Sequence, residues 1–186
     1  HLELRRWGLV PFWAKDPKIG NRLINARAEG VEQKPSFRTA FRRHRCLVPA
    51  DGFYEWAPAN GFSGSAPAGR RKQPFYIRRS DAQVFAMAGL YETWHAGQAD
   101  EIASFTILTT DANALLQKIH ARMPVILDAR SWKPWLDPKT PASELQPLLV
   151  PADPAGFEAV PVTTLVNSPA VDEPRCREPI RDSIER

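Results

Sequence analysis

The chain has 186 residues, of which 43% are hydrophobic, and this size and composition predict one domain with a real core, with or without a tail. No run of about 18 apolar residues occurs, so no membrane span is expected, and two cysteines are too few for a disulfide framework. The net charge of +4 is modest, and a reducing, cytoplasmic setting is the simplest expectation.

The first part of the chain predicts short strands and turns. A polar segment at 24–29 and a short helix at 36–43, with Ser36 as its N-cap, interrupt this pattern. Residues 57–71 are rich in Gly, Ala, Ser and Pro and predict a mobile surface loop. Strands or extended segments are expected at 7–13, 45–49 and 52–56.

The second part predicts further strands with a few helices. Leu115, Leu116 and Ile119 share one face of a helix expected from Asp111 toward His120. Further short helices are expected at 131–136 and 143–149. Strands are expected at 74–79, 84–91, 103–109, 122–127 and 157–162.

Short strands, few helices and many turns predict an α+β fold with a mostly antiparallel, barrel-like sheet. We expect a single domain at 1–171 and a charged, poorly ordered tail at 172–186.

Basic residues are concentrated at the start of the chain. Residues 1–45 contain eleven Lys and Arg against four Asp and Glu, a balance of +7, and the rest of the chain carries −3. Cations interleaved with aromatic rings suit single-stranded nucleic acid, because phosphates attract the charge and bases stack on the rings. The alternative is a solvated basic face beside core aromatics. The cations are Arg5, Arg6, Lys15, Lys18, Arg22, Arg27, Lys34, Arg38, Arg42, Arg43 and Arg45.

Four short motifs place polar or reactive side chains within apolar runs. A buried polar side chain costs about 1–3 kcal/mol unless it finds a partner, so several of them together indicate a site. The motifs are WGLVPFW at 7–13, LINARAE at 23–29, GFYEW at 52–56 and HARMP at 120–124.

In this order and spacing, and with AMAGLYETW, FTILTTDAN and VNSPAVDEP, these motifs resemble the SOS-response-associated peptidase (SRAP) family. Members of that family act on abasic sites in single-stranded DNA. The resemblance runs from about Arg6 to about Pro169 and implies the same α+β, barrel-like fold.

The resemblance implies roles for individual residues. Asn25, Glu55 and His120 match the family's catalytic positions, and Arg27 matches a phosphate contact, for which a guanidinium fork is suited. Trp7 and Gly8 match a loop with a role in DNA binding. The basic segment adds Lys18, Arg22 and Arg43 as expected DNA-binding residues.

Each candidate has a structural alternative. Asn25 is otherwise a turn cap, and Arg27 with Glu29 is otherwise an exposed ion pair worth about 0–1 kcal/mol. Glu29 is expected to hold the arginine in either case. Trp7 is otherwise a core residue, and His120 is otherwise the end of a helix.

Glu55 lies between Tyr54 and Trp56, so desolvation should raise the pKa of its carboxyl and suit it to acid–base work. The alternative is a strand glutamate that points to solvent. Cys46 is expected to be a small buried hydrophobe rather than a nucleophile.

The start of the sequence departs from the family. The family's nucleophile is a cysteine directly after the initiator methionine, in a Met-Cys-Gly start, whereas this sequence begins His1-Leu2-Glu3-Leu4. The 186-residue chain is therefore expected to lack the crosslinking step, whether through truncation or through numbering that omits the native start.

The sequence thus predicts a sensor of abasic sites in single-stranded DNA. Full-length protein is expected to remove its own methionine and form a thiazolidine crosslink through the exposed cysteine. Alternatives are a non-catalytic single-strand-binding module and a thiol peptidase that acts on other proteins. No cofactor and no metal are expected, because the histidines and cysteines lack zinc spacing. Expected partners are abasic single-stranded DNA and replication-fork proteins, without a membrane, in a nucleoid-associated, cytoplasmic setting.

Overall fold

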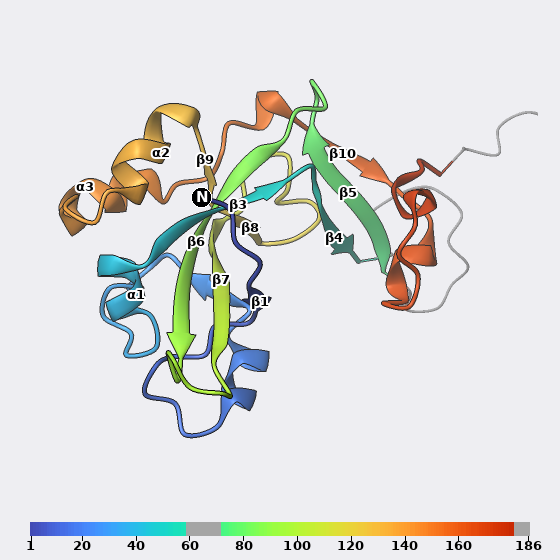
Figure 1. The fold of residues 1–186 in the computed structure, drawn as a ribbon. Helices are drawn as coiled ribbons and strands as arrows, with labels where there is room; N and C mark the ends of the chain where they lie inside the picture. Colours follow the sequence, from blue (N-terminus) through green and yellow to red (C-terminus); the bar gives the residue numbers. More distant parts are fainter. Residues whose placement is uncertain (59–71, 181–186) are drawn as a thin grey trace, which may run out of the picture. The chain divides into compact units, whose positions relative to one another are not determined.

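The structure, a computed structural model, describes residues 1–58 and 72–180 (Figure 1). The chain forms two compact units. The first unit consists of His1–Pro49, Phe85–Asp111 and Met123–Ala152. The second consists of Ala50–Val84, Ala112–Arg122 and Asp153–Arg186, without the residues outside the described ranges.

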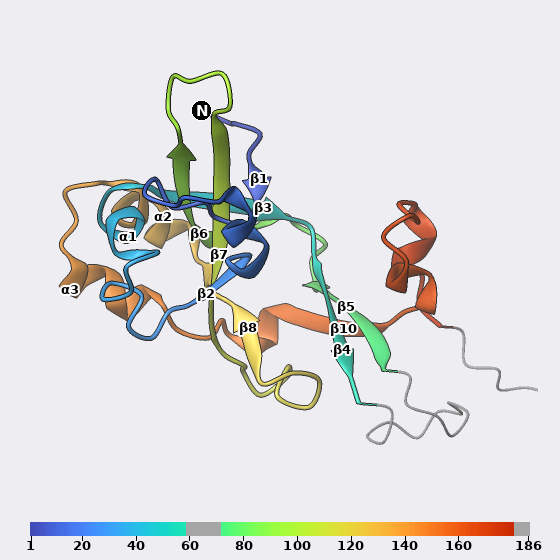
Figure 2. The same ribbon diagram turned by 90° about the horizontal axis from the view of Figure 1, so that it is seen from below.

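The first unit is built on a seven-stranded sheet with the central order β1-β7-β6-β3. Its two long strands, β6 and β7, are antiparallel and pair from Gly89↔Ile107 to Trp94↔Ile102, as Figures 1 and 2 show. In the described residues this order does not return to its starting strand, so the sheet is open. Its strands are β1 (Arg6–Trp7), β2 (Asn25–Arg27), β3 (Arg45–Ala50), β6 (Phe85–Trp94), β7 (Ile102–Asp111), β8 (Arg122–Pro124) and β9 (Ile126–Leu127).

The edge of β7 opposite β6 carries two short strands. Strand β1 pairs in parallel with Ser104 and Phe105, and β2 pairs in parallel with the segment from Ile107 to Thr109. The segments WGLVPFW and LINARAE therefore meet along one strand edge, although residues 14–22 separate them in the chain.

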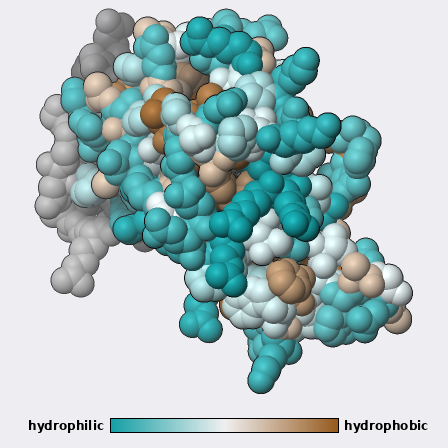
Figure 3. Space-filling view, turned by 90° about the vertical axis from the view of Figure 1, so that its left-hand side faces the viewer, coloured by the Kyte–Doolittle hydropathy of each residue, from teal (hydrophilic) through white to brown (hydrophobic). Residues whose placement is uncertain are grey.

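Three short α-helices accompany this sheet: α1 (Arg38–Arg43), α2 (Ala129–Leu136) and α3 (Ala142–Leu145), the last followed by η3 (Gln146–Leu148). Figures 1 and 2 both show the three α-helices on the same side of β6. Phe41 of α1 meets Trp135 of α2 edge to face, with ring centroids 6.1 Å apart, in a core that includes Leu90 and Leu108. On the face drawn in Figure 3 hydrophilic residues predominate, and hydrophobic ones form small, separate patches.

The second unit contains a three-stranded antiparallel sheet of order β10-β5-β4. Glu55 lies opposite Phe75, and Ala159 lies opposite Ile77. The strands are β4 (Phe53–Ala57), β5 (Gln73–Arg79) and β10 (Phe157–Pro161). Short 3-10 turns adjoin them at η4 (Pro154–Gly156), η5 (Thr164–Asn167) and η6 (Pro174–Arg177).

The predicted α+β class with few short helices is confirmed, and the expected strands are present with shifted ends. The sheet expected to be barrel-like is an open sheet in the described residues. The prediction of one domain at 1–171 stays a prediction. Most of the loop predicted at 57–71 lies outside the described residues. No helix of the described chain has the length and apolar character to cross a membrane.

Two local predictions are wrong. Asp111 ends β7, and residues 114–119 then form only turns, in which Leu116 and Gln117 donate to the Asn113 carbonyl. A few apolar residues do not offset the cost of nucleating a helix. Helix α1 begins after Phe37 without a side-chain cap, so Ser36 is not its N-cap.

The described part of the predicted tail, residues 172–180, is not poorly ordered. Residues 174–177 form η6, Val162 bridges Pro179, and Arg177 binds Asp51 at 2.7 Å. Cys176 is buried there, and its thiol donates to the Val171 carbonyl at 3.7 Å. Burial also raises the pKa of the Cys46 thiol to about 12, which agrees with a non-nucleophilic cysteine.

A buried carboxyl outside the predicted site is expected to make stability depend on pH. Glu92 is 4% exposed and lies 3.3 Å from Nδ1 of His44, whose ring stacks on Tyr91. Burial is the largest influence on the pKa of Glu92 and raises it, while His44 opposes the rise. When the pKa of a carboxyl is higher in the folded than in the unfolded state, it stabilises the fold at pH values below its unfolded-state pKa. This stabilisation is lost as the pH rises through the folded-state pKa.

We therefore expect Glu92→Gln to flatten the decline in the free energy of unfolding between about pH 4.5 and neutral pH. Glutamine keeps the shape and does not titrate. Urea unfolding at a series of pH values measures the effect. The exposed Glu144→Gln is the matched control and should keep the wild-type profile. Parallel profiles for Glu92→Gln and wild type would contradict the expectation.

Candidate functional site

A cavity of about 680 Å³ lies within the second unit. Glu55 and Trp56 reach it from β4, while Lys72 reaches it from the residue before β5. His120 comes from the turn that follows β7. The cavity is lined by Glu55, Trp56, Lys72, His120, Thr164 and Asn167.

Glu55 and His120 face each other in this cavity. Oε1 of Glu55 lies 3.7 Å from Nδ1 of His120, and the Glu55 side chain is 23% exposed. Burial raises the pKa of Glu55, and His120, the Trp56 backbone N–H and Lys72 oppose the rise. The pKa direction predicted from the GFYEW motif is thus borne out, and a carboxyl of this kind can accept and return a proton.

The backbone of Arg122 orients the imidazole of His120. Nδ1 of His120 lies 3.1 Å from the Arg122 amide nitrogen and 3.0 Å from the Arg122 carbonyl oxygen. Because residues 114–119 form turns, His120 does not end a helix, and that alternative is wrong. The HARMP motif therefore fixes the ring through its own backbone, two residues further on.

Trp56 is held at the cavity by a residue that the sequence did not single out. Its indole Nε1 donates to Oδ1 of Asn167 at 2.7 Å. Asn167 belongs to the VNSPAVDEP segment, and the resemblance of that segment to the family is the one sequence feature that could have indicated it. Nothing in the pattern around Thr164 or Lys72 pointed to a site.

A second group of predicted residues meets in the first unit, along the edge of β7. Trp7 donates from its indole to the Ile24 carbonyl at 2.7 Å and stacks on Phe105, yet stays 53% exposed. Trp7 is therefore not a core residue. Asn25 and Arg27 are both exposed on β2, with Ala26 buried between them.

Lys18 and Arg22 lie beside these strands on η1 (Pro17–Arg22). Asp16 caps this turn by accepting from the Lys18 amide at 2.8 Å, and Arg6 donates to Asn21 at 3.0 Å. The structure thus brings Trp7, Gly8, Lys18, Arg22, Asn25 and Arg27 into one region of the first unit.

Gly8 makes this region possible. Its φ is +116°, and a Cβ there would lie 2.6 Å from the Gly20 carbonyl oxygen. The close approach places β1 against η1, and Gly8 donates to the Phe105 carbonyl at 2.8 Å.

We expect Gly8→Ala to destabilise the protein by about 2 kcal/mol or more, because backbone strain and a backbone clash add. Gly97→Ala is the matched control, since Gly97 has a φ of +78° with nothing within 4 Å of a Cβ. The control should cost only about 1–2 kcal/mol for the left-handed backbone. Chemical unfolding measures both, and equal losses would contradict the role of the close approach.

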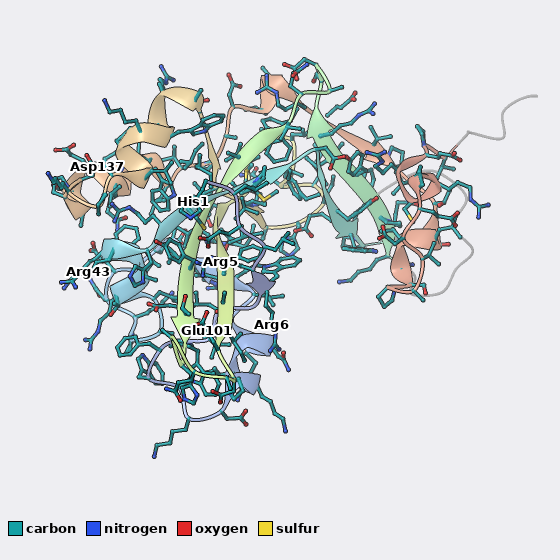
Figure 4. The ribbon with its side chains drawn as sticks, in the orientation of Figure 1. His1, Arg5, Arg6, Arg43, Glu101 and Asp137 are labelled. Atoms are coloured by element: carbon teal, nitrogen blue, oxygen red, sulfur yellow. The ribbon has the colours of Figure 1, made fainter. Side chains whose placement is uncertain are left out.

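Two basic residues of the predicted DNA-binding segment lie elsewhere. Arg43 is on α1, and Figure 4 shows it on the other side of β6 and β7 from Arg6. Arg45 is 5% exposed and donates to the carbonyls of Trp135 and Phe41 at 2.6 Å each. The guanidinium of Arg45 is thus buried in the core and cannot bind phosphate. The basic residues of 1–45 therefore do not form one continuous surface.

The predicted catalytic residues fall in both units. Glu55 and His120 belong to the second unit, and Asn25 belongs to the first. The roles given to Asn25, Glu55 and His120 and to the DNA-binding residues stay predictions. In the described parts of the chain, no group of three or more His, Cys, Asp or Glu is placed to hold a metal ion.

Comparison with known proteins agrees with the motifs. Abasic site processing protein YoqW of Bacillus subtilis (strain 168) is 45% identical over 174 residues, 93% of this chain and 74% of that protein. Abasic site processing protein HMCES of Gallus gallus is 35% identical over 200 residues, 94% of this chain and 56% of its own length.

The fold also matches solved structures. A crystal structure of a protein from Bacteroides thetaiotaomicron superposes with a TM-score of 0.81 at 32% identity, covering 94% of this chain and 75% of that one. Residues 1–169 match the family described as SOS response associated peptidase (SRAP). The chain belongs to the SRAP family.

Proposed function

We propose that this protein processes abasic sites in DNA and recognises them in single-stranded form. The observation that carries the proposal is the cavity in which Glu55, with its raised pKa, faces His120 at 3.7 Å. The relatives YoqW and HMCES, both named abasic site processing proteins, support it. An abasic site exposes a ring-opened aldehyde, and addition to an aldehyde needs groups that move protons.

The covalent step that we propose uses an N-terminal cysteine at a Met-Cys-Gly start, exposed by removal of the methionine. Its amine condenses with the aldehyde to give an imine and water, and its thiol then adds across the C=N bond to close a thiazolidine. Glu55 moves protons in these steps, and His120 assists ring opening and reversal. Asn25 orients the terminal residue. The sequence begins at His1, so this chemistry is assigned to a protein that carries such a start.

The first unit supplies the proposed DNA contacts. Exposed Trp7 can stack on a base, because every base offers a π-face. Arg27, Arg22 and Lys18 supply positive charge for the phosphates. The setting we propose is the cytoplasm, on the nucleoid, near the proteins of the replication fork.

Equilibrium binding tests this proposal on the chain itself. Fluorescence anisotropy compares one labelled single strand with an abasic site against the same strand intact. We expect tighter binding of the abasic strand and weaker binding of duplex. Equal affinity for the abasic and intact strands would favour a non-catalytic single-strand-binding module. Cleavage of unrelated proteins, with no affinity for DNA, would favour a thiol peptidase.

A further inference from the structure

One amine in the cavity has no part in the proposed function. Of the described residues that line the cavity, only Lys72 carries a primary amine. It lies directly before β5, whose Gln73 pairs with Ala57, two residues beyond Glu55 on β4. The positive charge of Lys72 is close enough to Glu55 to influence that carboxyl.

We propose that Lys72 forms a reversible imine with the aldehyde of an abasic site bound in this cavity. The proposal rests on the proposed function and names a second nucleophile for the same substrate. In this proposal the first covalent bond to the aldehyde forms in the cavity of the second unit.

The proton balance of this step suits the neighbouring carboxyl. The ammonium of Lys72 gives one proton to the Glu55 carboxylate, and the free amine adds to the aldehyde carbon to form a carbinolamine. Glu55 then returns the proton to the carbinolamine hydroxyl, which leaves as water. The sum is ammonium plus aldehyde giving iminium plus water, with Glu55 unchanged and no other reactant consumed.

The surroundings of Glu55 favour this exchange. Lys72 is exposed, and a lysine amine adds to an aldehyde only after its ammonium has given up a proton. Burial raises the pKa of the Glu55 carboxyl, and a carboxyl of this kind can accept a proton and return it. His120, 3.7 Å from the carboxyl, and Thr164 add polar groups around the same space.

Reductive trapping tests the proposal. The chain is incubated with single-stranded DNA that contains one abasic site, sodium cyanoborohydride reduces any imine to a secondary amine, and mass spectrometry of tryptic peptides finds the modified residue. We expect modification at Lys72. Lys72→Arg should lower the trapped yield by about tenfold or more, because arginine keeps the charge but stays protonated.

Lys139→Arg is the matched control, since Lys139 is exposed and belongs to the first unit, and the trapped yield should not change. Modification only at the His1 amine or at Lys139, with an unchanged yield for Lys72→Arg, overturns the proposal. Anisotropy without reductant is run in parallel. Preferential binding of abasic DNA without a Lys72 adduct overturns the imine alone, whereas loss of that preference overturns the proposed function with it.

Discussion

Replacing Glu55 by glutamine is expected to slow the reaction with an abasic site by about 10²–10⁴-fold and to leave the affinity for single-stranded DNA nearly unchanged. Glutamine has the size of glutamate and keeps a carbonyl oxygen near His120, but it cannot take up or release a proton. Burial raises the pKa of the Glu55 carboxyl, as expected of a proton-transfer group.

The measurement is the rate of adduct formation in protein that carries an N-terminal cysteine, with anisotropy for binding. Glu158→Gln provides the control, because Glu158 is a glutamate of the same sheet that pairs with Arg78 at 2.7 Å and does not line the cavity. It should react at the wild-type rate. An unchanged rate for Glu55→Gln would make Glu55 structural.

Reversing the charge of Arg27 is expected to weaken binding to single-stranded DNA about tenfold, equally for strands of different sequence. Arg27 is exposed on β2, so its guanidinium can meet phosphate oxygens, and phosphate contacts carry no sequence information. If about four phosphates are neutralised, log K should fall with log salt at a slope of about −3.

Salt titration followed by anisotropy gives the slope directly. Arg27→Glu should make the slope shallower by about 0.7, the value for one phosphate on a single strand. Lys139→Glu, an exposed reversal between α2 and α3, should change neither affinity nor slope. A slope near zero for the wild-type protein would contradict the proposal that the first unit binds DNA phosphates.

The local strand pattern was predictable because it depends on short-range chemistry. Alternating and apolar runs bounded by turn residues located β3, β4, β5, β6 and β7 to within a few residues. The helix expected from Asp111 is absent because β7 continues through Asp111, and the residues after it, 114–119, form only turns. Tertiary pairing of this kind is not visible in a local pattern.

The site was predictable to the extent that its residues lie in motifs. GFYEW and HARMP are 64 residues apart, and the structure brings Glu55 and His120 to 3.7 Å within one unit. Lys72, Thr164 and Asn167 were missed because their place in the cavity depends on how β5 and η5 pack, not on their neighbours in sequence.

The basic segment shows the limit of counting charge. Arg45 belongs to the same run of cations as Arg43, yet its guanidinium is buried among backbone carbonyls of α1 and α2. Two arginines of equal charge can thus have different roles, and the burial of the side chain distinguishes the structural one from the exposed one.

The most direct test of abasic-site processing is a denaturing gel. Protein that carries a Met-Cys-Gly start is incubated with one single strand that contains an aldehydic abasic site, and with a matched strand whose abasic analogue has no aldehyde. The account predicts a denaturation-resistant adduct with the aldehydic strand only, and its loss when the terminal cysteine is replaced by alanine. Adducts of equal yield on both strands, or none on either, would contradict it.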